Sequence, residues 1–115
     1  MADISFERLD VFRVALEFRA LVARIVPRRA NRELRDQLDR ASTSVVLNIA
    51  EGAGRWQRND KRRFYEVARG SASESAAVLA VLEATGEIGS APHAQARELA
   101  ARVVAMLTRL CQRTA

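Results

Sequence analysis

Apolar residues recur every three or four positions in four stretches of this 115-residue chain, which is the spacing of one face of an α-helix. The stretches predict helices over residues 5–26, 31–52, 59–85 and 91–113. Helices of this length span roughly 30–39 Å, and the connectors between them are short. Because near-equal helices with short connectors pack as antiparallel neighbours, the sequence predicts one all-α domain, residues 1–115, folded as an up-down-up-down four-helix bundle.

Capping and breaking residues set the predicted ends of these helices. Ser5 is a suitable N-cap for the first helix, and Pro27 ends it because the residue before a proline is disfavoured in helical geometry. Asn31 opens the second helix, and Asn59 caps the third. Gly86 supplies the C-terminal stop of the third helix, since glycine readily adopts the left-handed conformation found there.

The first and fourth predicted helices each carry two apolar stripes. In the first helix the stripe assigned to the core contains Leu9, Phe12, Leu16, Ala20 and Ala23, and the other contains Val11, Ala15, Phe18, Val22 and Ile25. In the fourth helix the core stripe contains Leu99, Val103, Met106 and Leu110, and the other contains Ala100, Val104, Leu107 and Cys111. A helix in a monomeric bundle needs one apolar face about 100° wide. The surplus predicts a second buried surface and therefore a homo-oligomer, unless the core face is broad and the remaining apolar residues are scattered on the surface.

The chain is basic, with a net charge of +5, and Lys61 is its only lysine. A basic domain is compatible with nucleic acid, an acidic protein or an anionic membrane surface as a partner. The N-terminus lacks the pattern of a signal peptide, and no apolar run approaches the ~20 residues that span a bilayer. The expected location is the cytoplasm, with no membrane partner.

The residues that most enzymes require are scarce. His93 is the only histidine and Cys111 the only cysteine, and both fall on the fourth predicted helix. They would lie about 27 Å apart along that helix, so they cannot form a catalytic pair within one chain. One histidine also cannot supply the Glu-x-x-His pairs of a di-iron bundle, and the glycines match no phosphate-binding loop. The sequence predicts a protein that is not an enzyme and that has no metal or cofactor.

Polar residues interrupt the inner stripes of the second and third helices. Asn48 and Glu51 in the second helix, and Ser71 and Glu74 in the third, fall on or beside these stripes, with Arg55 close by in sequence. Buried polar groups require hydrogen-bonding partners, so the five residues predict one interior polar network. The network would fix the register of the two helices, contact a ligand or partner, or, as a carboxylate pair, perform acid–base chemistry.

Three glycines accompany this network, at positions 52, 54 and 70. They would let helix backbones approach closely, or let the second helix end in a left-handed turn. The inner stripe of the third helix, in which Gly70 lies, is predicted to contain Phe64, Val67, Ala68, Ser71, Ser75, Val78 and Leu82.

The loop between the second and third helices is strongly basic and aromatic. Its candidate nucleic-acid contacts are Arg55, Trp56, Arg58, Lys61, Arg62 and Arg63. Arginine and lysine neutralise phosphates, and exposed aromatic rings stack on single-stranded bases. Alternatively, Trp56 covers the end of the bundle or enters an oligomer interface, and Arg62 or Arg63 pairs with Glu66. A second arginine cluster around residues 24–35 would lie at the opposite end of an up-down bundle.

Two motifs give the chain a family resemblance. Residues 37–41, Gln-Leu-Asp-Arg-Ala, and residues 44–55, ending in Asn-Ile-Ala-Glu-Gly-Ala-Gly-Arg, resemble the signature of four-helix-bundle proteins encoded in intervening sequences of large-subunit ribosomal RNA genes. Residues 64–74 resemble the second motif of that family, and residues 9–12 its entry into the first helix. Val46 departs from the pattern, because many relatives have a proline there that would kink the second helix. In the sequence 86–88, Gly-Glu-Ile, an aromatic found in many relatives is missing.

The resemblance implies a ring-shaped homo-oligomer, with a pentamer as the expected assembly. One related branch, the accessory proteins of diversity-generating retroelements, binds nucleic acid and a reverse transcriptase. We therefore expect a small oligomeric module that binds RNA or DNA through its basic surface, or acts as an accessory to a protein that does. The alternative is a protein–protein scaffold without a nucleic-acid role.

Overall fold

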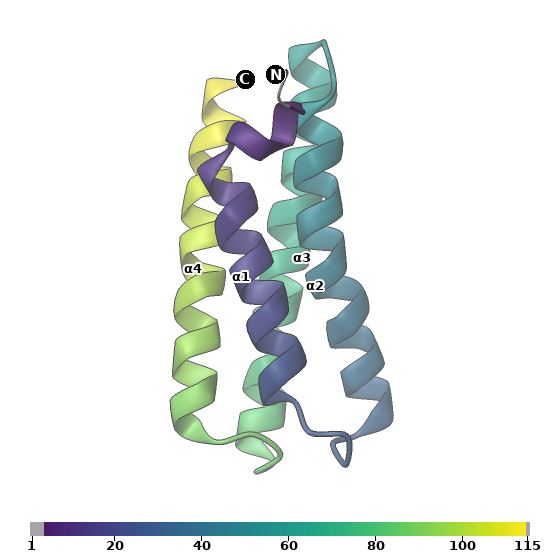
Figure 1. Ribbon diagram of the computed structural model, residues 1–115, viewed down its shortest axis with the longest axis vertical. Coiled ribbons are helices and arrows are strands. Elements are labelled where there is room, and N and C mark those ends of the chain that lie inside the picture. Colours follow the sequence, from purple (N-terminus) through teal and green to yellow (C-terminus); the bar gives the residue numbers. More distant parts are fainter. Residues whose placement is uncertain (1–3, 115) are drawn as a thin grey trace.

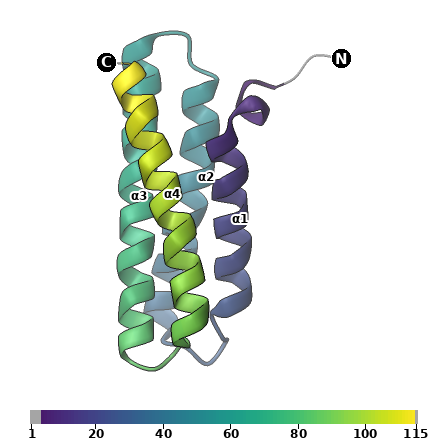
Figure 2. The same cartoon turned by 90° about the vertical axis from the view of Figure 1, so that its left-hand side faces the viewer.

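The computed structural model describes residues 4–114, which form a 3-10 helix and four α-helices (Figure 1). In chain order these are η1 (Ser5–Arg8), α1 (Asp10–Ile25), α2 (Arg32–Ala53), α3 (Arg58–Ala84) and α4 (Ser90–Arg113). The α-helices run alternately up and down, each packs against its neighbours in sequence, and α1 also packs against α4 (Figures 1 and 2). The protein is thus an all-α four-helix protein with antiparallel neighbouring helices. No helix within residues 4–114 is long and apolar enough to cross a membrane.

The predicted first helix over residues 5–26 is wrong at its start. Residues 5–8 form η1, and Leu9 is extended (φ −87°, ψ 124°) before α1 begins at Asp10. Ser5 is therefore not the N-cap of α1. Instead, the Glu7 carboxylate accepts a hydrogen bond from the Ile4 backbone N–H at 2.9 Å, which stabilises the tight turn. The bend lets η1 cross toward the upper end of α2, which it contacts (Figure 1).

The other helix ends follow capping chemistry, with one correction. The Asn31 side chain accepts a hydrogen bond from the Leu34 backbone N–H at 3.0 Å, so it is the N-cap of α2. Gly86 has φ +77° and ends α3 as expected. Asn59, however, lies within the first turn of α3, because Gln57 is the extended residue before the helix. At Val46 the helix continues without interruption, in agreement with the absence of a proline.

The second apolar stripe of α1 supplies most of its buried residues, while Leu9 and Phe12 of the stripe assigned to the core are partly buried against it. The buried residues are Val11, Val14, Ala15, Phe18, Leu21 and Val22. The stripe assigned to the core faces outward at Leu16, which is 46% exposed, and at Ala20 and Ala23. Both stripes have helical spacing, so periodicity alone could not choose between them. Packing favours the stripe with Phe18, whose side chain is fully enclosed.

A similar one-residue change occurs at the start of α3. Tyr65 is buried and Phe64 only half-buried, while Val67 is largely exposed. The buried positions of α4 are Ala96, Ala100, Val103 and Leu107. Buried side chains form two clusters, one around Ile49, Tyr65 and Leu107 and the other around Phe18, Leu79 and Leu82.

The lower end of the bundle is closed by the α1–α2 and α3–α4 connectors. Ile88 and Ala30 are buried together in the second cluster. The Glu87 carboxylate accepts hydrogen bonds from the Asn31 backbone N–H at 2.5 Å and from the Thr85 hydroxyl at 2.9 Å. Glu87 therefore connects the α3–α4 connector to the start of α2.

Candidate nucleic-acid interface

The interior polar residues of α2 and α3 meet through a serine that the sequence analysis did not include. The Ser44 hydroxyl lies 2.9 Å from the Ser71 hydroxyl, and the Asn48 amide donates to the Ser44 hydroxyl and carbonyl at 3.0 and 2.9 Å. Ser75 donates to the Ser71 carbonyl at 2.8 Å. These uncharged groups satisfy one another at the α2–α3 contact, which is the arrangement that buried polar side chains need.

Glu51 and Glu74 do not belong to this cluster, so that part of the predicted network is wrong. Each follows a fully buried residue by two positions, Ile49 and Ala72, and two residues correspond to about 200° around a helix. Both carboxylates consequently point to solvent, where their charge costs little. Glu51 pairs with Arg55 at 2.8 Å, and Glu74 accepts from the Gln37 side chain at 3.2 Å.

Of the three glycines, only Gly52 provides a close approach between helices. A Cβ atom there would lie 2.8 Å from Cε1 of Tyr65, so the phenol ring packs directly on the α2 backbone. Gly70 has no neighbour within 4 Å of that position. Gly54 has φ −83°, so α2 does not end in the predicted left-handed turn. Gly52 and Tyr65 thus fix how α2 and α3 meet near the basic loop.

Three of the predicted nucleic-acid contacts are engaged by the protein itself. Arg55 pairs with Glu51, and its guanidinium lies 4.7 Å from the centre of the Phe64 ring. The Lys61 ammonium donates to the carbonyl oxygens of Gly52 and Ala53 at 3.3 and 3.0 Å, where a cation is favoured at the C-terminal end of α2. Arg62 lies 3.7 Å from Glu66, as the alternative interpretation expected.

Five arginines at the same end have no carboxylate within ion-pair distance among residues 4–114. Two of them were predicted contacts, Arg58 and Arg63, the second of which lies 5.2 Å from the Phe64 ring. The other three, Arg8, Arg109 and Arg113, come from η1 and α4 and were missed. The up-down topology was the signal that could have found them, because it places the start and the end of the bundle beside the α2–α3 loop (Figure 1). We call these five residues the basic end.

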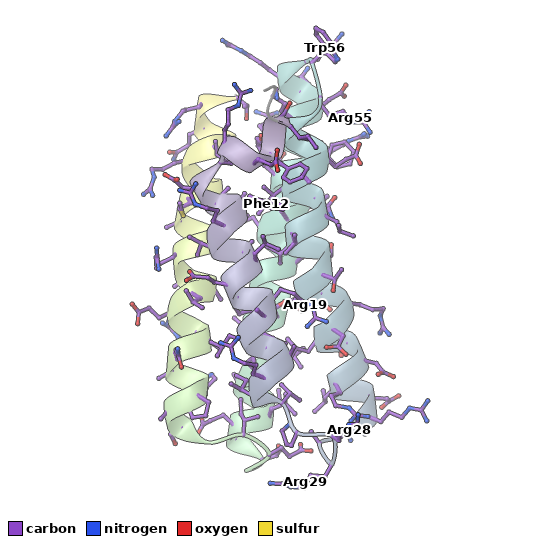
Figure 3. All side chains as sticks on the ribbon, viewed as in Figure 1. Phe12, Arg19, Arg28, Arg29, Arg55 and Trp56 are labelled. Atoms are coloured by element: carbon purple, nitrogen blue, oxygen red, sulfur yellow. The ribbon has the colours of Figure 1, made fainter. Side chains whose placement is uncertain are left out.

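Trp56 lies at the tip of this end and is 97% exposed. Figure 3 shows Trp56 and Arg55 at the top of the bundle, with Arg28 and Arg29 of the second arginine cluster at the bottom. Trp56 also lines a cleft of about 600 Å³ between η1 and the α2–α3 loop. Arg8 contributes to that cleft and to an adjoining one of about 280 Å³, where Arg109 and Arg113 lie.

Burial favours the neutral forms of two side chains at this end of the bundle, Tyr65 and Cys111. Burial raises the pKa of the Tyr65 phenol, and the negative charge of a Cys111 thiolate would raise it further. Burial and the neighbouring Glu66 carboxylate raise the pKa of the Cys111 thiol, against the smaller opposing effects of Arg69 and Arg62. A raised thiol pKa disfavours the nucleophilic thiolate. No group of three or more metal-ligating side chains occurs among the described residues.

Two comparisons place the chain among known proteins. Residues 7–109 match the model of the 23S rRNA-intervening sequence protein family. The fold is similar to that of a protein of unknown function from the S23 ribosomal protein family of Bacteroides thetaiotaomicron, with a TM-score of 0.83 and 21% sequence identity over 89% of this chain and 98% of that one. No curated protein matches the chain. Since the family match covers most of the sequence, this chain belongs to the 23S rRNA-intervening sequence protein family.

Proposed function

We propose that this protein is a non-enzymatic, self-associating module that binds nucleic acid with its basic end. The observation that carries the proposal is that Arg8 of η1 and Arg55 line one cleft with the exposed Trp56. Arg8 also lines the adjoining cleft, together with Arg109 and Arg113 of α4. Glu51 pairs with Arg55. Glu66 pairs with Arg62, so each of these carboxylates neutralises one arginine near the loop. The five unpaired arginines therefore give this end a positive potential that attracts phosphates.

Salt-dependent binding tests this proposal. Labelled RNA and DNA, each single- and double-stranded, would be titrated with the protein between about 50 and about 200 mM salt. Affinity should fall steeply with salt, because each neutralised phosphate releases counterions. Arg8→Ala/Arg58→Ala should weaken binding and reduce the log–log salt slope by about 2.

The lower end supplies a matched control. Arg28→Ala/Arg29→Ala removes the same charge from exposed residues at the opposite end of the bundle (Figure 3). Affinity and salt slope should stay close to those of the parent protein. Absence of binding at low salt, or equal weakening by both double variants, would overturn the proposal.

Self-association, which we propose to produce a ring of five subunits, is supported by the outward stripe of α1. Leu16, Ala20 and Ala23 are exposed although they continue an apolar stripe with Phe12. Such a stripe is typical of a surface that another subunit covers. Leu16→Asp should lower the mass found by light scattering, whereas Gln95→Asp, which adds the same charge on an exposed part of α4, should not. A monomer mass for the parent protein at micromolar concentration would exclude the ring.

A protein–protein scaffold or retroelement-type accessory role is the second candidate. It is favoured by Leu47, which is 61% exposed beside a hollow of about 510 Å³ that Asn48 and Arg40 also line. Under this function a defined protein partner, for example a reverse transcriptase, should co-purify after nuclease treatment and be lost from Leu47→Asp. Loss of all partners on nuclease treatment would favour the nucleic-acid function instead.

A further inference from the structure

Trp56 is exposed far beyond what the fold requires. A tryptophan carries a large apolar area, and burying such a side chain stabilises a fold. Here the indole extends into solvent from the tip of the α2–α3 loop and is 97% exposed. A Trp at this place gains its contacts only when a second molecule covers it.

We propose that the partner at this end is single-stranded nucleic acid, with an unpaired base stacked on Trp56 and an adjacent phosphate in the cleft beside Arg8. The inference rests on the proposed function and adds the strand class and the residue that selects it. Trp56 and Arg8 line the same cleft of about 600 Å³, from the α2–α3 loop and from η1.

The engaged cations connect the α2–α3 loop to the helices on either side of it. Arg55 contacts Glu51 and the face of Phe64, and Lys61 donates to the last carbonyls of α2. Such contacts lower the entropy that the loop would lose when a base stacks on Trp56. Arg8 is exposed and has no carboxylate partner among residues 4–114, which leaves its guanidinium able to bind a phosphate.

The exposed indole and the cleft with Arg8 together favour single-stranded nucleic acid over duplexes and anionic membranes. In a duplex the base faces are covered by neighbouring pairs, whereas a single strand offers each base as a stacking surface. An anionic membrane would also attract arginines and tryptophan, and its headgroups carry phosphates, but a lipid offers no planar base to stack on the indole. A single strand supplies both a base that stacks on the indole and a phosphate that binds in the cleft.

Because Trp56 is the only tryptophan, its fluorescence reports directly on this site. The experiment titrates the full chain with a uracil or thymine oligonucleotide, with a loop-free two-stranded duplex of the same number of phosphates, and with vesicles containing anionic lipid. The single strand should quench the emission on binding. Trp56→Ala should weaken strand binding, measured by anisotropy of the labelled oligonucleotide, about 5- to 150-fold, and Trp56→Phe should lose less. Neither substitution should change duplex binding by more than about twofold.

The two proposals fail in different ways. If Trp56→Ala binds the strand as tightly as the parent, or the strand binds without quenching, the stacking inference is overturned while salt-dependent binding through Arg8 and Arg58 still stands. If only the vesicles bind, both proposals fall. Since Trp56 contacts little of the fold, circular dichroism should show the variants as folded as the parent, so a loss of binding reports on the site.

Discussion

Gly52 and Gly70 are both helical residues, but only Gly52 touches another helix. An added Cβ at Gly52 would meet the Tyr65 ring at 2.8 Å and the Lys61 carbonyl oxygen at 3.2 Å. The same atom at Gly70 would meet nothing within 4 Å. Alanine substitutions at the two positions therefore distinguish the intrinsic helix propensity of alanine from the steric effect of an added Cβ atom on helix packing.

Substitution of each glycine by alanine should change stability in opposite directions. Gly70→Ala should raise the free energy of unfolding by about 0.5–1 kcal/mol, since glycine is a poor helix former. Gly52→Ala should lower it by about 1–3 kcal/mol, because the ring and a backbone carbonyl must move. Urea unfolding followed by circular dichroism measures both. A stabilised Gly52→Ala variant would show that the Tyr65 contact is not tight.

Cys111 should react slowly with alkylating reagents at neutral pH. Burial and the charge of Glu66 raise the pKa of its thiol above the usual value of 9.0, so little thiolate forms. The rate of iodoacetamide modification should rise with pH along a curve displaced upward from that of the urea-unfolded chain. Glu66→Gln should move the curve back down, since it removes a negative charge. A native curve at or below that of the unfolded chain would contradict this assignment.

The same pKa shift has a consequence for stability. The folded protein holds the thiol proton more tightly than the unfolded chain does. The stabilisation is fully present below the pKa of the unfolded thiol and is lost as pH rises through the higher pKa of the folded one. Tyr65, whose pKa is also raised, acts in the same direction at higher pH. Unfolding should therefore become easier on the alkaline side.

At the scale of the helices, the two asparagines predicted at helix starts have different roles. Asn31 accepts the Leu34 backbone N–H, and its own N–H donates to Glu87. Asn59 is an exposed residue within the first turn of α3. Sequence alone treats the two alike, because both are good capping residues that precede a helical stripe.

Substitution by alanine should change the free energy of unfolding by different amounts at these two positions. Asn31→Ala should lower the free energy of unfolding by about 1 kcal/mol through loss of the cap. Asn59→Ala should stay within about 0.5 kcal/mol of the parent, as exposed positions do. Thermal or urea unfolding of the pair provides the comparison, and equal effects would show that the side chain of Asn31 is not capping α2.

The number, order and direction of the helices could be predicted from the sequence, whereas the side that some helices turn inward could not. Helix α2 has one dominant apolar stripe, and its residues Leu38, Val45 and Ile49 are buried. Helix α1 has two stripes of the same period, and the choice between them depends on the shape of the partner helices. Likewise, hydroxyl and amide groups were predicted in a polar contact and lie in one, whereas the predicted carboxylates lie outside it, because a charge costs far more to bury than a hydroxyl or an amide.

At the scale of the whole molecule, the protein has two basic ends separated by the length of a bundle whose longest dimension is 44 Å (Figure 3). The upper end has unpaired arginines and the exposed Trp56. At the lower end Arg32 lies 3.9 Å from Asp36, and Arg35 donates to the Arg28 carbonyl. In the topology shown in Figure 1, residues from η1, α3 and α4 reach the upper end together, which no single sequence window could reveal.

If the upper end is a binding surface, Trp56 should stay accessible in the assembled protein. Its emission should match that of a free tryptophan derivative at concentrations where light scattering shows the full assembly. Iodide should quench it efficiently, aided by the surrounding arginines. Blue-shifted emission that appears only with assembly would instead assign Trp56 to the contact between subunits.

The meeting of η1 with the end of α4 has a practical consequence for handling this protein. Arg8 and Leu9 share a cleft with Leu110 and Arg113, so residues near both chain ends emerge beside the basic end. A purification tag at either end would crowd that surface. Fusion partners are better inserted in the α1–α2 or α3–α4 connector, which leaves the basic end free of appended sequence.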